Sequence, residues 1–476
     1  MSHIHKIAIV GAGFSGTMVA VQLLRQIQQP LTVYLIEPNQ AQVGRGVAYS
    51  TDQDCHLLNV PACNMSAFPD EPAHFFAWAK ARENKLLQSQ WVTEVTPEAF
   101  LPRRIYGDYL IDILNNAEDS AKSNRLIRKV DRVVKITTDS EQATLSLLAG
   151  ESLSVHKVVL AIGNFPPGDP WVTTPHFYTS GRYVNNPWQS GLLTTILKSK
   201  SCLLIGSGLT MVDWAVLLKE ADYQGKIHSI SRRGLAPQAH HAYPKILPPI
   251  QLFNQPNVRK LLHSLRRLIQ ETACDWRLVI DSLRPISPTI WASLPKIEQQ
   301  RFLRHLRTYW DCHRHRLAPA IAKKVDDLRN TGQLHQHVGR ILAYHETHQG
   351  VNVSIKSRGN SQTQTLNVDL VVNCSGSESD YRKLDCPLVK NLLEQGLARP
   401  DPLALGLDVS IDGELIDSNG ELSNLLFTLG PPQKGVFWET TAVPEIRGQA
   451  EKLASLLLST LPTPKNLAVS SITDTG

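Results

Sequence analysis

Residues 6–24 read KIAIVGAGFSGTMVAVQLL, an apolar run followed by three glycines and then by apolar residues at helical spacing. A second apolar run, residues 31–36, ends directly before Glu37. Strand, glycine turn, helix and strand in this order predict a βαβ unit of a parallel sheet. We interpret this unit as the start of a dinucleotide-binding, Rossmann-like domain.

The residues of this turn have separate roles in such a domain. Gly11 allows the tight turn, Gly13 lets the backbone approach a pyrophosphate, and Gly16 lets the helix pack near the strand. Amides at the start of the helix face the phosphates, and a carboxylate at the end of the second strand accepts hydrogen bonds from the ribose hydroxyls. The cofactor contacts predicted here are Gly11, Gly13, Phe14, Ser15, Gly16, Glu37 and Pro38.

A second βαβ pattern has a strand at 202–205, the turn Gly206-Ser-Gly208, a helix at 210–219 and a strand at 226–230. The spacing from Gly11 to Glu37, applied to Gly206, reaches Arg232. Serine and arginine side chains there suit a 2′-phosphate, so NADPH is preferred over NADH. Met211 replaces the third glycine, so this site is either altered or has lost its nucleotide. The predicted NADP contacts are Gly206, Gly208, Leu209, Thr210, Ser231, Arg232 and Arg233.

Several segments resemble a bacterial family of FAD/NAD(P)-binding proteins, similar in plan to the flavin-containing and N-hydroxylating monooxygenases. They are GRGVAY (44–49), HLLNVPA (56–62), LPRRIYGDYL (101–110), GSGLTMVD (206–213), WDCHRHR (310–316) and residues 430–448. The resemblance covers nearly the whole chain, and the first glycine turn with residues 58–61 is its most specific part. It implies that the first unit binds FAD.

The resemblance also implies individual contacts. Ala161-Ile-Gly163 resembles a turn that crosses near the flavin pyrophosphate, with Ile162 in place of the usual threonine. Gly430 resembles the glycine of a C-terminal Gly-Asp motif, although Pro431 stands in place of the acid. Arg103 and Arg104 are equally consistent with a flavin or substrate contact and with a solvated face. The FAD contacts implied are Gly46, Asn59, Val60, Met65, Arg104, Ala161, Gly163, Asn164 and Gly430.

The predicted fold class is α/β, with two dinucleotide-binding domains, the second inserted in the first. The expected boundaries are 1–200 and 361–476 for the FAD-binding domain, and 201–360 for the NAD(P)-binding-like domain with a helical insert at about 240–330. A small meander is expected from strands at 126–134 and 143–148. Further strands are expected at 157–162, 340–344, 351–355, 368–373 and 425–429, and a last helix at 444–458 that Thr440 or Thr441 could cap.

Other candidate sites are weaker. Arg314 and Arg316 are candidates for lining a cleft for an anionic substrate, and the pair at 240–241 is a candidate catalytic histidine or an ordinary loop. Residues 178–188 only loosely fit the fingerprint of Baeyer–Villiger monooxygenases and are interpreted as a linker. His313 and His315 point in different directions on a helix, so no metal site is expected.

Composition limits the remaining function classes. The chain has 476 residues with a formal charge of +6, too small an excess to indicate a nucleic-acid binder. No secretory signal or membrane span is expected, and the 7 scattered cysteines suit a reducing cytoplasm. Hydrolase and zinc-site motifs do not occur in the sequence.

The function expected from the resemblance is that of an FAD-dependent, NADPH-using monooxygenase. Molecular oxygen would react at the reduced flavin to form a C4a-hydroperoxide, which oxidises a small molecule. Two alternatives stay open: a flavin dehydrogenase or reductase with another acceptor, and a flavin- or NADP-binding redox sensor without enzymatic activity. The substrate, the catalytic residues and the oligomeric state are not predicted.

Overall fold

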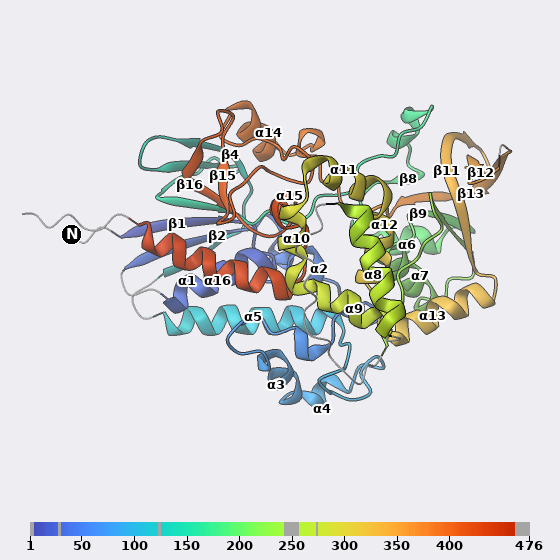
Figure 1. Cartoon of the computed structure of the whole chain (residues 1–476), viewed down its shortest axis with the longest axis horizontal. Helices are drawn as coiled ribbons and strands as arrows, with labels where there is room; N and C mark the ends of the chain where they lie inside the picture. Colours follow the sequence, from blue (N-terminus) through green and yellow to red (C-terminus); the bar gives the residue numbers. More distant parts are fainter. Residues whose placement is uncertain are drawn as a thin grey trace, which may run out of the picture.

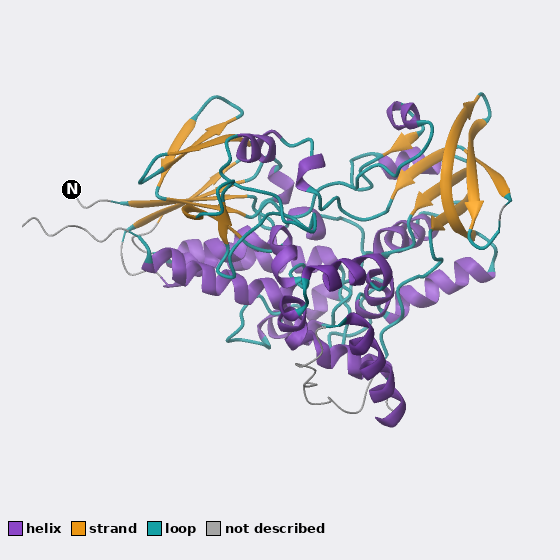
Figure 2. Cartoon of the chain, turned by 45° about the horizontal axis from the view of Figure 1, so that its top comes forward, coloured by secondary structure: helices purple, strands orange, loops and turns teal. Residues whose placement is uncertain are grey.

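The computed structural model describes residues 4–26, 30–121, 125–241, 257–272, 275–360 and 362–461. Its two large sheets lie at opposite ends of the molecule, and most of the helices lie between and below them (Figures 1 and 2). The predicted fold class, a mixed α/β chain with two Rossmann-like sheets, is confirmed. The domain boundaries themselves stay a prediction.

Six strands form the first sheet: β1 (His5–Val10), β2 (Leu31–Ile36), β3 (Arg125–Lys129), β7 (Lys157–Leu160), β15 (Glu414–Ile416) and β16 (Leu422–Thr428). Their order is β15-β16-β7-β1-β2-β3, and only the edge strand β15 pairs antiparallel. Strand β7 is buried along its whole length, as expected for a parallel sheet covered on both faces.

Helices cover this sheet on the side seen below it in Figure 1. Helix α1 (Phe14–Gln26) packs against both α5 (Arg103–Ser120) and α16 (Val443–Ser459), so the two ends of the chain share one core. The shorter elements of this region are η1 (Gln40–Gln42), α2 (Gly46–Tyr49), η2 (Ala62–Asn64), α3 (His74–Lys80) and α4 (Glu83–Leu86).

The expected meander is present but differs from the prediction. It is formed by β4 (Val133–Thr138), β5 (Ala143–Leu147) and β6 (Ser152–Val155), all antiparallel. The strand expected at 126–134 is two strands, because its first part is β3, which pairs parallel with β2. The corner between them, residues 130–132, contains no glycine or proline that would mark the break. Helix α14 (Pro387–Glu394) packs on β4, and η5 (Tyr381–Lys383) precedes it.

Seven strands form the second sheet: β8 (Tyr183–Val184), β9 (Ser201–Ile205), β10 (Lys226–Ser231), β11 (Leu334–Thr347), β12 (Gly350–Ser357), β13 (Thr363–Val368) and β14 (Leu370–Asn373). Their order is β13-β12-β11-β10-β9-β14-β8, with antiparallel pairing only at β11-β12-β13. The predicted strands at 202–205, 226–230, 340–344, 351–355 and 368–373 are confirmed, whereas β8 and β13 were not predicted. The associated helices are η3 (Pro175–Thr179), α6 (Leu192–Leu197), α7 (Leu209–Glu220) and α13 (Pro319–Asn330).

The predicted helical insert lies between the two sheets (Figure 1). Its described helices are α8 (Val258–Thr272), α9 (Trp276–Leu283), η4 (Arg284–Ile286), α10 (Ser287–Ser293), α11 (Lys296–His305) and α12 (Arg307–Arg314). Residues 242–256 of the expected insert lie outside the described residues. Helix α10 packs on α15 (Lys434–Phe437), which follows η6 (Pro431–Gln433), so the insert contacts the C-terminal part of the first unit. Among the described helices, none has the length and apolar character to cross a membrane.

Candidate nucleotide-binding site

The first glycine turn joins β1 to α1 and lies against the residue that follows β7. Gly11 has a φ of +101°, and a Cβ at this position would lie 2.3 Å from the carbonyl oxygen of Ala161. A Cβ at Gly16 would lie 1.9 Å from the carbonyl oxygen of Gly11. Both positions therefore exclude a side chain. The turn stands at the carboxyl edge of a parallel sheet, where such folds bind nucleotides.

Glu37 lies beside this turn and is 8% exposed. Its carboxylate accepts hydrogen bonds from the backbone N–H groups of Ala12, at 3.1 Å, and Asn39, at 3.2 Å. The first amides of α1 have no partner inside the helix and carry its partial positive charge. The turn therefore offers donors for a phosphate next to a fixed acceptor for hydroxyl groups.

Three of the glycines implied as FAD contacts surround the same turn. A Cβ at Gly46, whose φ is +58°, would lie 2.9 Å from the Cα of Gly13. A Cβ at Gly430, whose φ is +76°, would lie 2.8 Å from Oγ of Ser15. Gly163, with a φ of +64°, has no atom within 4 Å of its Cβ position and so borders open space. The structure brings together segments that are far apart in the sequence.

The remaining implied FAD contacts are more scattered. Met65 is buried in the first core, with Val60 packed against that core. Asn59 accepts a hydrogen bond through its carbonyl, as described below. The guanidinium of Arg104 hydrogen-bonds the carboxylate of Asp54 and thereby lowers the pKa of that carboxyl group. Pro38 and Asn164 are exposed.

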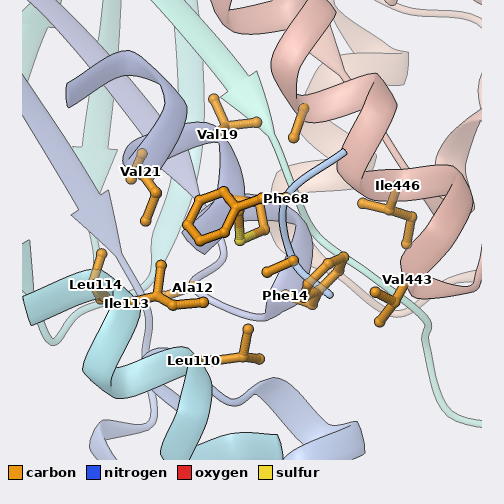
Figure 3. Close-up of a cluster of buried hydrophobic side chains, with 14 of the residues drawn as sticks. Ala12, Phe14, Val19, Val21, Phe68, Leu110, Ile113, Leu114, Val443 and Ile446 are labelled. Carbon is orange, nitrogen blue, oxygen red and sulfur yellow. The ribbon is translucent and has the colours of Figure 1, made fainter. Parts of the chain in front are cut away.

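The start of α16 also reaches the first turn. Figure 3 shows Phe14 of α1 beside Val443 and Ile446 of α16, all within one hydrophobic core. The hydroxyl of Thr440 donates to the carbonyl of Gly430 at 3.0 Å. The N-cap residue is Ala442, which makes no side-chain capping bond, so the prediction of a threonine cap is wrong. The positive end of this helix therefore has no side-chain cap.

The second glycine turn repeats the geometry of the first. Gly206 has a φ of +117°, and a Cβ there would lie 2.4 Å from the carbonyl oxygen of Cys374, which follows β14 as Ala161 follows β7. Two residues later Gly376 has a φ of +95° and open space at its Cβ position, like Gly163. This crossing was not predicted, although an apolar strand followed by small residues and a glycine is present here as it is at 157–163.

Met211 does not prevent this geometry. Its side chain is 1% exposed and packs in the core of the second unit. The backbone N–H of Val212 still donates to the carbonyl of Gly208 at 3.1 Å, as Thr17 donates to Gly13 at 2.9 Å in the first turn. The side chain is accommodated within the core, and the start of α7 is formed normally.

The hydrogen bonds of the two turns also align the residues at the expected ribose positions. The N–H of Gly11 donates to Ile36 and that of Gly206 donates to Ile230, both at 2.8 Å. The residue after Ile230 is Ser231, so Ser231 stands where Glu37 stands in the first unit. Counting along the sequence placed Arg232 there, because the second unit is one residue shorter between these points.

The two arginines that follow have different surroundings. Arg232 is exposed and makes no ion pair with any residue of the described ranges. Arg233 donates to the carbonyl oxygens of His305, at 2.7 Å, and Arg304, at 3.1 Å, and its guanidinium lies over the ring of Tyr309. In this structure Arg233 therefore anchors the helical insert, and Arg232 is the arginine open to a ligand.

Arg103 links the two units. Its guanidinium donates two hydrogen bonds to the carboxylate of Asp213 in α7, at 2.8 and 3.0 Å, and a third to the carbonyl of Leu57. The side chains of Arg103 and Asp213 are 17% and 11% exposed. Two segments that the family resemblance had singled out, 101–110 and 206–213, thus meet in one bidentate ion pair.

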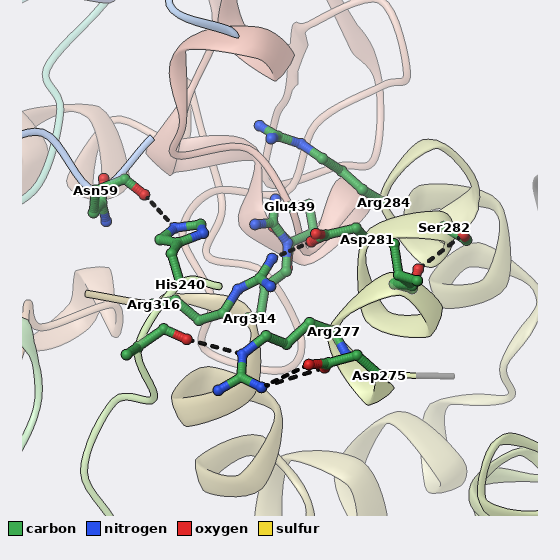
Figure 4. Close-up of polar contacts among 12 residues, drawn as sticks. Asn59, His240, Asp275, Arg277, Asp281, Ser282, Arg284, Arg314, Arg316 and Glu439 are labelled. Atoms are coloured by element: carbon green, nitrogen blue, oxygen red, sulfur yellow. Dashed lines mark hydrogen bonds and ion pairs between the residues drawn. The ribbon is translucent and has the colours of Figure 1, made fainter. Parts of the chain in front are cut away.

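A buried polar cluster connects the insert to the C-terminal segment (Figure 4). Arg284 pairs with Glu445 of α16, and Arg314 lies 3.5 Å from Glu439 and 3.7 Å from Glu445. Arg316 hydrogen-bonds Asp281. Arg314 and Arg316 were predicted to line a cleft for an anionic substrate, apart from the other charges of this region. Both are buried beside carboxylates, and their contact with a substrate stays a prediction.

His240 lies beside this cluster and contacts the flavin-side loop. Its Nε2 is 2.9 Å from the carbonyl oxygen of Asn59 (Figure 4). Burial, together with the charges of Arg316, Arg314 and Arg277, lowers the pKa of His240 to about 4. The ring is therefore neutral near pH 7, and the contact with Asn59 requires the proton to be on Nε2.

The other candidates have structural partners. Tyr183 and Asn185, from the loosely matching fingerprint, both hydrogen-bond Asp169. His313 contacts the carbonyl of Tyr309. In the ranges that the structure describes, no group of three or more His, Cys, Asp or Glu side chains could hold a metal ion.

Comparison with known proteins agrees with this architecture. Residues 8–165 match a family model described as FAD-NAD(P)-binding. No curated protein matches the sequence. The L-lysine 6-monooxygenase of Pseudomonas syringae has a TM-score of 0.66 and 16% identity, over 97% of this chain and 100% of that one. The ornithine N-hydroxylase of Kutzneria sp. 744, with reduced FAD, NADP⁺ and L-ornithine, has a TM-score of 0.62 and 12% identity, over 96% of this chain and 99% of that one.

The fold is shared beyond the monooxygenases. The bacillithiol disulfide reductase of Bacillus cereus has a TM-score of 0.52 and 13% identity, over 96% of this chain and 99% of that one. At these identities the likeness shows the fold. The family match and the two glycine turns together show that this chain carries an FAD-NAD(P)-binding domain within the fold of the two-unit flavoproteins.

Proposed function

We propose that the protein is an FAD- and NADPH-dependent monooxygenase acting on a small molecule. The main support is that two equivalent glycine turns have different residues at the expected ribose position. This residue is Glu37 in the first turn and Ser231, next to exposed Arg232, in the second. A carboxylate suits the unmodified ribose of FAD, and a serine with an arginine suits a 2′-phosphate. One chain thus offers a flavin site and a separate NADPH site.

The residues present fit the two nucleotides. FAD would be held by the first turn, the amides of Phe14 and Ser15, Glu37, and the glycines at 46, 163 and 430 that leave room for it. NADPH would be held by Gly206, Gly208, Leu209 and Thr210 at the start of α7, with Ser231 and Arg232 at the phosphorylated ribose. When bound, FAD would accept a hydride from NADPH and then react with oxygen.

The domain plan follows from the same placement. Residues 1–200 and 361–476 would form the FAD-binding domain, and 201–360 the NADPH-binding domain with its insert. Because the insert packs on the 431–445 segment, it would enclose the space where the flavin ring and a substrate meet. Neutral His240 would orient groups there by hydrogen bonding rather than act as a strong base.

Oxygenation is favoured over disulfide reduction. A disulfide reductase needs a reactive thiol pair, and the sequence contains no Cys-x-x-Cys motif. Burial raises the pKa values of Cys55 and Cys202 to about 12, so neither thiol is a nucleophile near neutral pH. Three of the similar structures are named for the hydroxylation or monooxygenation of ornithine, lysine or cadaverine. We therefore propose a small amine as the substrate class and, from the scattered cysteines, a cytoplasmic location.

The test is to supply the FAD-loaded protein with NADPH, isotopically labelled oxygen gas and a panel that includes ornithine, lysine and cadaverine. A monooxygenase places one labelled oxygen atom in the product and the other in water. The panel is then widened to amines, thioethers and heterocycles. If NADPH is oxidised but all the label is recovered in hydrogen peroxide or water with every compound, the protein is a reductase. Absence of NADPH oxidation would favour a redox sensor.

A further inference from the structure

Lys434, at the start of α15, carries a charge that no neighbouring acid neutralises. Its ammonium group makes no hydrogen bond or ion pair with any residue in the described parts of the chain. The side chain is only partly exposed, and its Nζ lies 4.9 Å from the ring centre of Trp438. Burial and, to a smaller extent, the charge of Arg307 lower the pKa of Lys434 to about 8.

The acids nearest to Lys434 already have other partners. Glu439 accepts a hydrogen bond from the indole N–H of Trp310 at 2.8 Å and faces Arg314 at 3.5 Å. Asp311 pairs with Arg307 on the same helix, at 3.6 Å. Each carboxylate therefore faces an arginine, and Lys434 is the cation left over.

A second cation approaches the same indole ring. The guanidinium carbon of Arg307 in α12 lies 6.0 Å from the ring centre of Trp438. The charge of Arg307 is near enough to lower the pKa of Lys434, and an anion bound beside both side chains would relieve this repulsion. The indole ring that both cations approach lies where the helical insert contacts the segment that follows Gly430.

Trp438 itself is held in an unusual conformation. Its backbone φ is +59°, a value that residues other than glycine rarely adopt, and the residue is 6% exposed. It stacks on Trp291 with ring centres 5.1 Å apart, and Trp291 in turn donates to the carbonyl of Gly435 at 2.8 Å. Strained backbone of this kind persists where the surroundings over-determine it, and such positions cluster at ligand sites.

We propose that Lys434 and Arg307 form a subsite for an oxyanion, the carboxylate or phosphate group of the substrate. Only the identity of the ligand as a substrate rests on the proposed monooxygenase function. The subsite itself rests on the unpaired ammonium, the second cation and the fixed indole ring that both cations approach. Compounds that bear an acidic group would then be preferred over neutral or purely cationic analogues.

The test measures how fast methyl acetimidate, which releases no carboxylate as it amidinates an amine, modifies individual lysines of the FAD-loaded protein. Peptide mass mapping gives these rates with and without inorganic phosphate or acetate. Lys324 is the matched control, because its Nζ also lies over an indole, that of Trp91 at 5.5 Å, but pairs with Glu220 at 2.9 Å. Saturable protection of Lys434 alone is expected. Arg307→Met should weaken that protection by roughly tenfold.

Tighter protection by acetate would identify a carboxylate ligand, and tighter protection by phosphate a phosphate ester; either result supports the subsite. No protection, equal protection of Lys324, or protection unchanged in Arg307→Met would overturn it. Full protection by FAD alone, in buffer without either anion, would also overturn it by assigning the charge to the cofactor. Neither NADPH nor oxygen is present, so the outcome is separate from that of the labelled-oxygen experiment.

Discussion

Ser231 occupies in the second βαβ unit the position that Glu37 occupies in the first. Each follows the strand residue whose carbonyl accepts a hydrogen bond from the first glycine of its turn, Ile230 for Gly206 and Ile36 for Gly11. The carboxylate of Glu37 would repel a 2′-phosphate, whereas a hydroxyl with an adjacent arginine would not. We propose that this single exchange gives the two similar turns different nucleotides.

The coenzyme preference should depend on Arg232. Arg232→Ala removes a charged contact to the 2′-phosphate, so we expect the KM for NADPH to rise by about tenfold or more while that for NADH changes little. Steady-state NADPH and NADH oxidation measure both values.

Arg233→Ala is the matched control for this experiment. Because Arg233 binds the carbonyl oxygens of His305 and Arg304, its loss should loosen the insert and lower Tm without changing the ratio of the two KM values. An equal effect of Arg232→Ala on both coenzymes would show that Arg232 does not bind the phosphate.

Flavin retention should depend on Glu37. The variant Glu37→Ala loses charge-assisted hydrogen bonds to the ribose worth roughly 1.5–3 kcal/mol, and it should release FAD on gel filtration. Since Glu37 also holds the N–H groups of Ala12 and Asn39, the Tm of the apoprotein should be compared between variant and parent. Equal FAD retention at low protein concentration would contradict the assignment.

The ion pair between Arg103 and Asp213 should couple the two units. Removing one partner leaves a partly buried charge, so Arg103→Met and Asp213→Leu should each cost about 3 kcal/mol in the free energy of unfolding. The double variant should cost clearly less than the two single losses combined, by at least about 1 kcal/mol. Denaturant unfolding of all four proteins gives this difference, and strictly additive losses would mean that the pair does not join the units.

The start of α16 should influence the flavin electrostatically. Thr441 is exposed and directly precedes the N-cap residue Ala442, so Thr441→Asp adds a negative charge there without removing a buried side chain. We expect the midpoint potential of the bound flavin to fall by about 6–21 mV, the equivalent of roughly 0.3–1 kcal/mol for two electrons.

Thr460→Asp, at the other end of α16, adds the same charge far from the turn and should leave the potential unchanged. Both variants must first be shown to be fully loaded with FAD. If Thr441→Asp has the potential of the parent, the helix does not point at the flavin ring.

The two βαβ units could be predicted because their evidence is local. Apolar strands, a glycine turn with forced backbone geometry and a largely apolar helix follow one another directly at 6–37 and 202–230. Strands β8 and β13 were missed for the opposite reason. β8 has two residues, and β13 has the polar sequence TQTLNV, so neither shows an apolar run, and both are fixed by pairing with distant strands.

The environment of the arginines could not be predicted for a related reason. Arg284 and its partner Glu445 are 161 residues apart, and only the folded insert brings them together. Arg232 and Arg233 are adjacent residues of the same type, yet Arg233 binds backbone carbonyls of the insert and Arg232 stays exposed. Residue type indicated the presence of charge, but the three-dimensional contacts decide which charges are available to a ligand.

The most direct test of the central claim is an anaerobic titration of the purified yellow protein with NADPH, followed by the visible absorbance of the flavin. We predict that about one equivalent of NADPH bleaches the flavin, that NADH does so much more slowly, and that Arg232→Ala removes most of this difference. A protein that carries no flavin, or a flavin that NADPH does not reduce, would contradict the account.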